Sequence, residues 1–370
     1  MLFSQIPAQN QLKIRLLKNL ANKRIAHAQL FVGQDGYGAL PLALAYAQYL
    51  NCHNPQPTDS CGVCNSCTKH QKLIFPDLHF TFPIITKPAK EEVCDDYLVE
   101  WRKAIVQNPF LDYHEWCGYL SAENKQGNIN ARECRNIIKK LTLTAYEGFY
   151  KVLILWKPNF LGKEANILLK LLEEPPENTV FLLVAETTEN ILPTIISRTQ
   201  LVRIPPMLDD ELLGFLQKKH PYIATETLET AVLGAEGSYT NAKTMIANEA
   251  DKDLELIFEN WMRSCYTNKG VEISEFIEKT VAAGREKQKQ LLQTGVLMLR
   301  RCFYYQAKPD SAEKSEFIRK FSVLVHKNNV NELVNQLNDT AKYIEGNVNA
   351  KLAWHTVSLE INVLLRSARP

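Results

Sequence analysis

Residues 29–40 read QLFVGQDGYGAL, and this stretch decides the fold. The apolar run at 29–32 is too short for a stable helix and predicts a buried strand. Gly33, Gly36 and Gly38 follow it, and the apolar, helix-like run PLALAYAQYL comes next. A strand, a glycine-rich loop and a helix in this order are typical of a phosphate-binding loop, whose backbone N–H groups hold phosphate oxygens. A glycine-rich turn without any link to nucleotides is the alternative.

The loop lacks the two side chains that phosphoryl transfer requires. In the pattern G-x-x-x-x-G-K-[ST], the lysine reaches the phosphates and the hydroxyl binds Mg²⁺. Ala39 and Leu40 stand at these positions. A second predicted strand, KVLIL at 151–155, is followed by Trp156 and Lys157, where an ATPase of this layout needs an acidic pair. The sequence therefore predicts a degenerate P-loop without the lysine or the Walker B acids, in a chain that is not itself an ATP-hydrolysing enzyme.

Two further apolar runs extend the predicted sheet, VFLLVA at 180–185 and QLVRI at 200–204. They alternate with helical patterns, so an α/β domain with a parallel sheet is expected over residues 1–205. Pro205 and Pro206 mark its end, because proline continues neither a strand ladder nor a helix interior. Small helical and all-helical domains are expected over 206–250 and 251–370. The weakly patterned stretch at about 76–133, rich in proline and aromatic residues, is expected to be an insertion.

Composition limits the classes of protein that remain. At about 150 residues per domain, 370 residues predict two or three domains. A content of 45% hydrophobic and 23% charged residues excludes a largely disordered chain. The net charge of +2 excludes a broadly basic, DNA-coating surface. The sequence contains no apolar run of about 18 residues, so no membrane association is expected, and the scattered, odd-numbered cysteines predict a cytoplasmic protein.

Four of the nine cysteines form a C-x8-C-x2-C-x2-C pattern: Cys52, Cys61, Cys64 and Cys67. Four thiolates at such spacings can close a tetrahedral, structural Zn²⁺ site with no open coordination position. Free thiols, a redox pair and an iron–sulfur cluster are the alternatives, although a cluster motif usually carries a proline after its last cysteine and Thr68 follows here. His53 and His70 are expected to be surface imidazoles.

Taken in order, these segments resemble the AAA+ clamp-loader family of bacterial DNA polymerase III and, within it, the delta prime subunits. The matching stretches are RIAHAQLFVG at 24–33, the cysteine knuckle, KVLIL, NILLKLLEEPPENTVFLLVAE at 166–186 and PTIISRT at 193–199. Defined motifs cover about residues 1–250, and the remainder matches by its helical character and by NVNAKL at 347–352. The resemblance implies an AAA+ domain with a zinc knuckle at 52–67, a helical lid at 206–250 and a helical collar for oligomerisation at 251–370.

The resemblance also implies roles for particular residues. Ser197, Arg198 and Thr199 match the family's Ser-Arg-Cys motif, with threonine in place of the cysteine. Arg198 would then be an arginine finger that reaches the ATP site of a neighbouring gamma/tau subunit, where a guanidinium meets developing phosphate charge. A solvated charge at a helix end is the alternative. Both sensor regions, at 185–186 and 237–238, lack the residues of ATP-hydrolysing relatives.

The partners implied by the resemblance are gamma/tau and delta subunits in a heteropentamer that loads the sliding clamp onto primed DNA. Zn²⁺ is the only cofactor expected, and it would be structural. Two alternatives stay open. The chain could be an active, gamma/tau-like ATPase that uses unusual residues, or a zinc-dependent nucleic-acid-binding module. Against the second alternative, residues 52–67 contain no lysine or arginine to neutralise phosphates.

Overall fold

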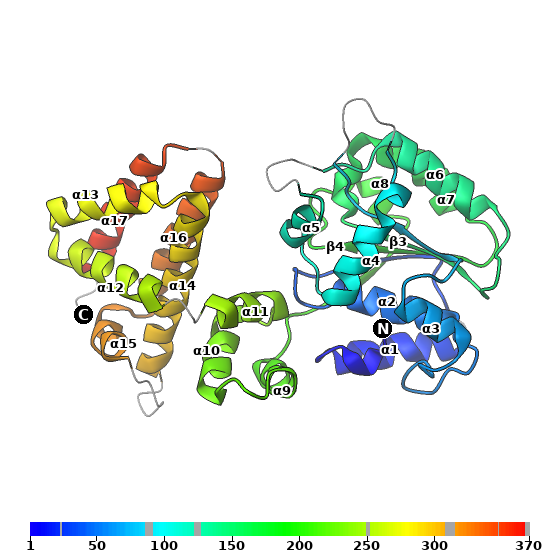
Figure 1. Cartoon of the computed structure of the whole chain (residues 1–370), viewed down its shortest axis with the longest axis horizontal. Helices are drawn as coiled ribbons and strands as arrows, with labels where there is room; N and C mark the ends of the chain where they lie inside the picture. The colour runs from blue at the N-terminus through cyan, green and yellow to red at the C-terminus, as the bar shows by residue number, and fades with distance from the viewer. Residues whose placement is uncertain are drawn as a thin grey trace. The chain divides into compact units, whose positions relative to one another are not determined.

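The computed structural model describes residues 1–22, 24–85, 92–121, 127–248, 252–307, 315–346 and 348–366. The chain divides into two compact units, each treated by itself below (Figure 1). The first comprises Met1–Pro221 with Ala235–Asn241, and the second Tyr222–Gly234 with Ala242–Pro370. The expected boundary at 250 and 251 and the first residue of the NVNAKL stretch lie outside the described residues.

A five-stranded parallel sheet forms the centre of the first unit, in the order β2-β3-β4-β1-β5. The strands are β1 (Ala28–Val32), β2 (Leu78–Thr81), β3 (Lys151–Trp156), β4 (Thr179–Ala185) and β5 (Gln200–Arg203). The predicted parallel sheet and its four predicted strands are confirmed. Strands buried on both faces form continuous apolar runs, and β3 and β4 are buried at every position.

Helices cover both faces of this sheet (Figure 1). On one face lie α6 (Ala131–Thr142), η3 (Pro158–Leu168), α7 (Leu169–Glu173) and α8 (Pro193–Ile196), which share a core with β1, β3 and β4. On the other face lie α1 (Asn10–Ala21) and α2 (Ala39–Leu50). Tyr46 of α2 contacts the sheet there, because its ring meets Phe31 edge to face and its hydroxyl accepts a hydrogen bond from Gln29. The loop after β1 is therefore anchored between strand and helix.

The stretch at 76–133 contains a strand that the sequence analysis missed. β2 pairs in parallel with β3 and forms one edge of the sheet. The described part of the stretch beyond it contains η2 (Cys94–Tyr97), α4 (Leu98–Gln107) and α5 (Tyr113–Tyr119). Its aromatic residues are core: Trp101 stacks on Phe82 and also contacts Trp116 and Trp156. Trp156, where the sequence analysis looked for an acid, is therefore a packing residue of the core.

The remaining elements of the first unit are η1 (Phe3–Gln5), α3 (Asn65–Gln71) and α9 (Asp209–Lys219). Within the described residues the second unit is helical. Its helices, with α10 and α11 shared across the division, are α10 (Thr225–Ala235), α11 (Tyr239–Asn248), α12 (Lys252–Thr267), α13 (Gly270–Ala282), α14 (Arg285–Ala307), α15 (Glu316–Phe321), η4 (Ser322–Leu324), α16 (Val330–Glu345) and α17 (Ala350–Arg366).

Two buried tryptophans join the helices of this second unit. Trp261 of α12 and Trp354 of α17 meet with their ring centroids 5.0 Å apart. Each indole N–H has a buried acceptor, Ser358 for Trp261 and Gln288 for Trp354. The tryptophans therefore fill the core without an unsatisfied donor.

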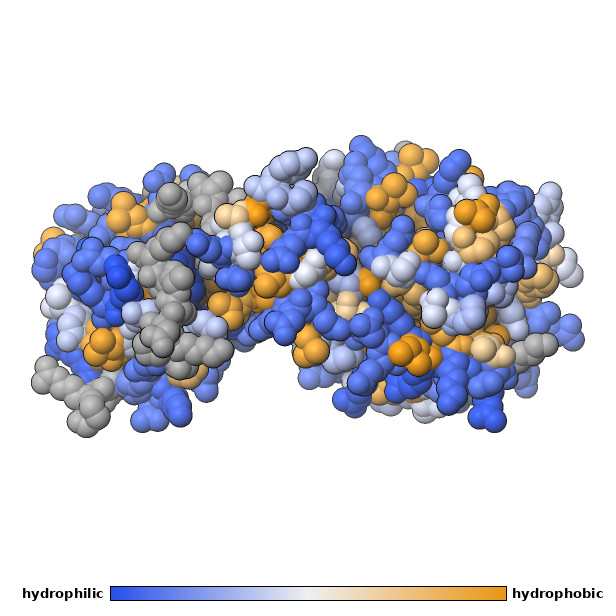
Figure 2. Space-filling view, turned by 90° about the horizontal axis from the view of Figure 1, so that it is seen from below, coloured by the Kyte–Doolittle hydropathy of each residue, from blue (hydrophilic) through white to orange (hydrophobic). Residues whose placement is uncertain are grey.

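The surface is dominated by hydrophilic residues on the face that Figure 2 shows, with hydrophobic residues in separate groups among them. Among the described helices, none combines the length and the apolar character that crossing a membrane requires.

Candidate functional site

The glycine-rich loop predicted to be a phosphate loop runs from the end of β1 to the start of α2. Gly36 and Gly38 have φ angles of +86° and +102°, a region that favours glycine. The N–H of Gly33 donates to the carbonyl of Ala185 at 3.0 Å, which ties the start of the loop to β4. The loop thus has the backbone course that the glycine spacing predicts.

The segment at Ser238 and Tyr239, next to the expected second-sensor position, packs directly on this loop. The Ser238 hydroxyl donates to the Asp35 carbonyl at 2.7 Å, and the N–H of Tyr239 donates to the Gly36 carbonyl at 3.1 Å. A Cβ atom on Gly36 would lie 2.1 Å from the Ser238 hydroxyl oxygen. Glycine at position 36 is therefore required by this close packing as well as by its backbone angle.

An internal cation occupies the end of the loop. The Lys157 ammonium donates to both carboxylate oxygens of Asp35, at 2.9 Å each, and also contacts Glu186. The Lys157 side chain is 3% exposed, whereas those of Asp35 and Glu186 are 32% and 41% exposed. Lys157 has a φ of +59°, which turns the chain sharply at the end of β3. Lys157, at the end of β3, thus supplies a positive charge to the glycine-rich loop.

This ion pair leaves little space in the loop. The cavity there has a volume of only about 20 Å³. Phe110 and Leu111, which precede α5, contribute to its lining. Burial raises the pKa of Asp35 to about 6, although Lys157 acts in the opposite direction. Among the described residues, Arg198 and the four cysteines do not line this cavity.

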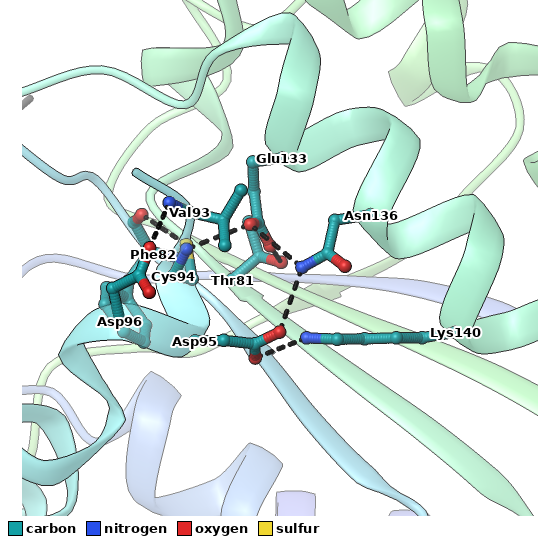
Figure 3. Close-up of polar contacts among 9 residues, drawn as sticks. All are labelled: Thr81, Phe82, Val93, Cys94, Asp95, Asp96, Glu133, Asn136 and Lys140. Carbon is teal, nitrogen blue, oxygen red and sulfur yellow. Dashed lines mark hydrogen bonds and ion pairs between the residues drawn. The ribbon is translucent and has the colours of Figure 1, made fainter. Parts of the chain in front are cut away.

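Two sets of contacts hold the stretch at 76–133, which includes Phe110 and Glu133. The Phe110 carbonyl accepts a hydrogen bond from the Thr240 hydroxyl at 3.1 Å, and its ring lies 4.7 Å from that of Tyr239. Further along the segment, the buried Glu133 carboxylate accepts hydrogen bonds from the Thr81 hydroxyl and the Cys94 N–H, both at 2.9 Å (Figure 3). Its burial raises the pKa of Glu133. These contacts fasten the inserted helices to the sheet.

Arg198 lies just after α8, in a different pocket. Its guanidinium donates to Glu173 through Nε, at 2.6 Å, and through Nη2. Nη1 donates to the Thr194 carbonyl at 2.8 Å and to the Ser197 hydroxyl at 3.3 Å. The pocket is an open recess of about 410 Å³ whose wall also includes His27. Arg198 is 31% exposed and therefore accessible from solvent.

The four knuckle cysteines converge as predicted. Their sulfur atoms all lie within 4.8 Å of one another, and Cys67 Sγ is 3.6 Å from Cys52 Sγ and 3.9 Å from Cys61 Sγ. A tetrahedral Zn²⁺ with four thiolates needs sulfur atoms about 3.8 Å apart. The cysteines thus fit such an ion, which would link the knuckle without offering an open position for chemistry.

Backbone N–H groups surround these sulfur atoms. The N–H groups of Cys61, Cys64 and Cys67 point at the sulfur atoms of Cys52, Cys61 and Cys64, at 3.3 to 3.4 Å. Hydrogen bonds from Val63 and Cys64 lower the pKa of Cys61 to about 6, whereas burial raises the pKa of Cys67. Such N–H···S bonds favour thiolate, the form that a metal requires.

The expectation for His70 was wrong. His70 is buried, its ring stacks on Phe75 with centroids 4.1 Å apart, and its Nδ1 lies 2.9 Å from the Ser66 carbonyl. Burial lowers its pKa to about 4. His70 follows the knuckle on α3, which turns its side chain toward the core. His53 is exposed, as expected.

Comparisons with known proteins identify the family. The family described as "DNA polymerase III, delta subunit" matches residues 8–208, more than half of the chain. The chain belongs to this clamp-loader family. The match spans the P-loop, the cysteine knuckle and the Ser-Arg motif.

Individual relatives are of both gamma/tau and delta prime type. The chain is 24% identical to DNA polymerase III subunit tau of Escherichia coli, over 66% of this chain and 32% of that protein. It is 28% identical to DNA polymerase III subunit delta' of Pseudomonas aeruginosa, over 60% of this chain and 56% of that protein. A DNA polymerase III gamma subunit-related protein from Thermotoga maritima superimposes with a TM-score of 0.44 at 16% identity, covering 96% of this chain and all of the other. Of the tau and delta' subunits named above, the matched part of this chain spans about a third and just over half, respectively.

Sequence reasoning missed the residues that fill the loop. It noted only that Lys157 and Glu186 differ from the residues that ATP-hydrolysing relatives carry there, and it did not connect either residue with Asp35. The signal was present, because β3, β4 and β1 are neighbours and their carboxyl ends meet at one edge of the sheet. Phe110, Leu111 and Glu173 were not singled out either, since their roles depend on contacts between distant parts of the sequence.

Proposed function

We propose that this chain is a non-hydrolysing clamp-loader subunit of the delta prime type. It joins gamma/tau and delta subunits in a ring that loads the sliding clamp onto primed DNA. It supplies Arg198, with Ser197 beside it, to the ATP site of a neighbouring gamma/tau subunit. The relatives include both subunit types at similar identity, so the distinction between them rests on the site itself.

The observation that carries this proposal is the ion pair in the phosphate loop. An ATPase of this layout places a lysine and a Mg²⁺ ion among the phosphates. Here the chain's own ammonium, that of Lys157, sits between the chain's own carboxylates of Asp35 and Glu186. The cavity beside this pair, of about 20 Å³, is small for a triphosphate. Even an opened loop would lack a side chain that binds Mg²⁺ at positions 40 and 156.

Arg198 fits the other half of the proposal. It is accessible, it lies at an open recess, and its planar guanidinium suits phosphate oxygens. If this chain does not hydrolyse ATP itself, the Arg198 guanidinium can act in ATP hydrolysis only at the site of a neighbouring subunit. The gamma/tau subunit would then supply the nucleotide, the Mg²⁺ and the turnover.

The domain scheme and the metal belong to the same proposal. Residues 1–205 form the AAA+ domain, 206–250 the lid and 251–370 the collar. Zn²⁺ bound by the four cysteines would be structural, because four thiolates complete its tetrahedral coordination. The ion would hold the knuckle together and take no part in turnover.

ATP turnover in the purified chain and in the reconstituted complex tests the proposal. The chain alone should neither bind nor hydrolyse ATP. With gamma/tau and delta, the Arg198→Ala variant should assemble normally but show lower clamp- and DNA-stimulated ATPase activity than the unmodified chain. Steady ATP hydrolysis by the chain alone would favour an active, gamma/tau-like subunit. Equal turnover with and without Arg198 would remove the arginine from the mechanism.

A further inference from the structure

We propose that Glu173 is a positioning residue for Arg198, and this inference rests on the proposed function. Glu173 is the last residue of α7, and Arg198 follows α8, so the two come from separate elements. One carboxylate oxygen, Oε1, accepts hydrogen bonds from both Nε and Nη2 of the arginine. Glu173 therefore fixes one edge of the guanidinium plane.

The hydrogen bonds of Arg198 define which part of it faces a partner. A guanidinium has five N–H bonds. Four of them donate within the chain, to Glu173, Thr194 and Ser197. The fifth, on Nη2, has no acceptor among the residues that the structure describes. That N–H lies on the side of Nη2 that faces Nη1, away from Glu173. Glu173 thus turns a flexible side chain into a single oriented donor.

The contact with Glu173 is poorly suited to stabilising the fold. The two side chains are 31% and 47% exposed, and exposed ion pairs contribute little to folding. Arginine, however, loses considerable rotamer entropy when it is held in one orientation. If Glu173 holds it beforehand, that entropy is not lost when a phosphate approaches. The benefit therefore appears in turnover by the neighbour and not in the stability of this chain.

The chain offers a matched control at the next residue. Glu174 is exposed, carries the same charge and lies at the end of the same helix. Glu173→Gln and Glu174→Gln change the net charge equally, but only the first weakens the contact with Arg198. A difference between them therefore reports on position and not on charge in general.

The experiment measures clamp- and DNA-stimulated ATPase activity of the complex with gamma/tau and delta. The variants are Glu173→Gln, Glu174→Gln, Arg198→Ala and the double variant Glu173→Gln/Arg198→Ala. The difference in turnover between the unmodified complex and the Arg198→Ala complex is the Arg198-dependent activity. Glu173→Gln should lower the kcat of this Arg198-dependent activity by about two- to fivefold with KM unchanged, as expected for an interaction made in the transition state. Glu174→Gln should behave like the unmodified chain.

Two further readouts separate positioning from a structural role. Glu173→Asp, which keeps the carboxylate, should recover part of the lost kcat. The double variant should equal Arg198→Ala alone, because Glu173 acts only through the arginine. Urea unfolding midpoints and assembly should not differ among the variants.

The outcomes test the role of Arg198 and the positioning role of Glu173 separately. If Arg198→Ala leaves turnover unchanged, the proposed function fails and takes this inference with it. If Arg198→Ala lowers turnover but Glu173→Gln does not, the proposed function stands and Glu173 has no positioning role. Faster turnover in Glu173→Gln would mean that Glu173 competes with phosphate for the arginine, and an added loss in the double variant would mean that it acts elsewhere. Either result overturns the inference.

Discussion

Lys157 is the residue on which the interpretation of the phosphate loop depends. It stands at the end of a buried strand, with its ammonium almost fully removed from solvent and bonded to Asp35 and Glu186. A buried charge without a partner is strongly destabilising, whereas a paired one is tolerated. The two carboxylates therefore offset the cost of burying the Lys157 ammonium.

Replacing Lys157 tests this dependence. Lys157→Met removes the cation and leaves the carboxylates of Asp35 and Glu186 facing each other. We expect the free energy of unfolding to fall by about 2 kcal/mol, less than for a fully buried pair because both acids are partly exposed. Urea unfolding measures this, with the exposed Lys163→Met as the control. Equal midpoints for the two variants would contradict a role for Lys157 in holding the loop.

His79 on β2 makes stability depend on pH. Burial lowers the pKa of His79 to about 4, and Lys140 acts in the same direction, while Asp77 and Asp95 oppose it. In the unfolded chain the His79 imidazole is protonated near pH 6.5, whereas in the folded chain it is protonated only near pH 4. Stability is therefore lost as the pH falls through this window.

We expect this loss to shrink when the imidazole is replaced. Between pH 7 and pH 4.5, the His79→Gln variant should lose roughly 2 kcal/mol less unfolding free energy than the unmodified chain. Urea unfolding at several pH values measures the difference. His114→Gln, which replaces an exposed imidazole, is the matched control. Identical pH profiles for His79→Gln and the unmodified chain would show that another group is responsible.

At the scale of elements, the cysteine knuckle is the part whose geometry most directly specifies a ligand. We expect one Zn²⁺ per chain by elemental analysis, because the four sulfur atoms lie within 4.8 Å of one another and can close around a tetrahedral ion. Removing the metal with a chelator should lower the unfolding free energy by about 3 kcal/mol or more.

Two cysteine variants check this expectation. Cys64→Ser should lose most of the bound zinc, and Cys265→Ser in the second unit should retain it. Iron in place of zinc, or zinc retained by Cys64→Ser, would contradict the assignment.

The elements also show how far the sequence reaches. Four strands were predictable because burial on both faces leaves continuous apolar runs, as in β3 and β4. β2 was missed because it is a short edge strand, at Leu78–Thr81, within a stretch of prolines and aromatics. Convergence of the four cysteines was predictable because their spacing is local. The roles of Asp35 and Glu173 were not, because their partners are 122 and 25 residues away.

At the scale of the whole molecule, the second unit leaves an apolar stripe on α17. Leu352, Leu359 and Val363 are each more than 60% exposed, and their spacing places them on one face of the helix. Such a stripe is suited to helix packing in an assembly, and it lies in the proposed collar.

A charge on this stripe should weaken assembly and leave folding intact. Leu359→Asp should change the unfolding free energy of the isolated chain by less than about 0.5 kcal/mol, as for other surface changes. It should weaken complex formation with gamma/tau and delta by about fivefold or more, since it buries a charge at an interface. Sedimentation or size-exclusion chromatography measures this, with the exposed Val323→Asp as the control. Equal assembly of the two variants would place the contacts of the collar elsewhere.

The Lys157 ammonium inside the loop also limits what a substitution at position 39 could do. A lysine placed at position 39 would enter a cavity whose lining already includes Lys157, and the two like charges would repel each other. It would still find no acid after β3 to bind a magnesium ion. The chain's own ammonium thus acts as a built-in occupant of the loop, and a second cation placed beside it is expected to lower stability without adding a ligand for magnesium.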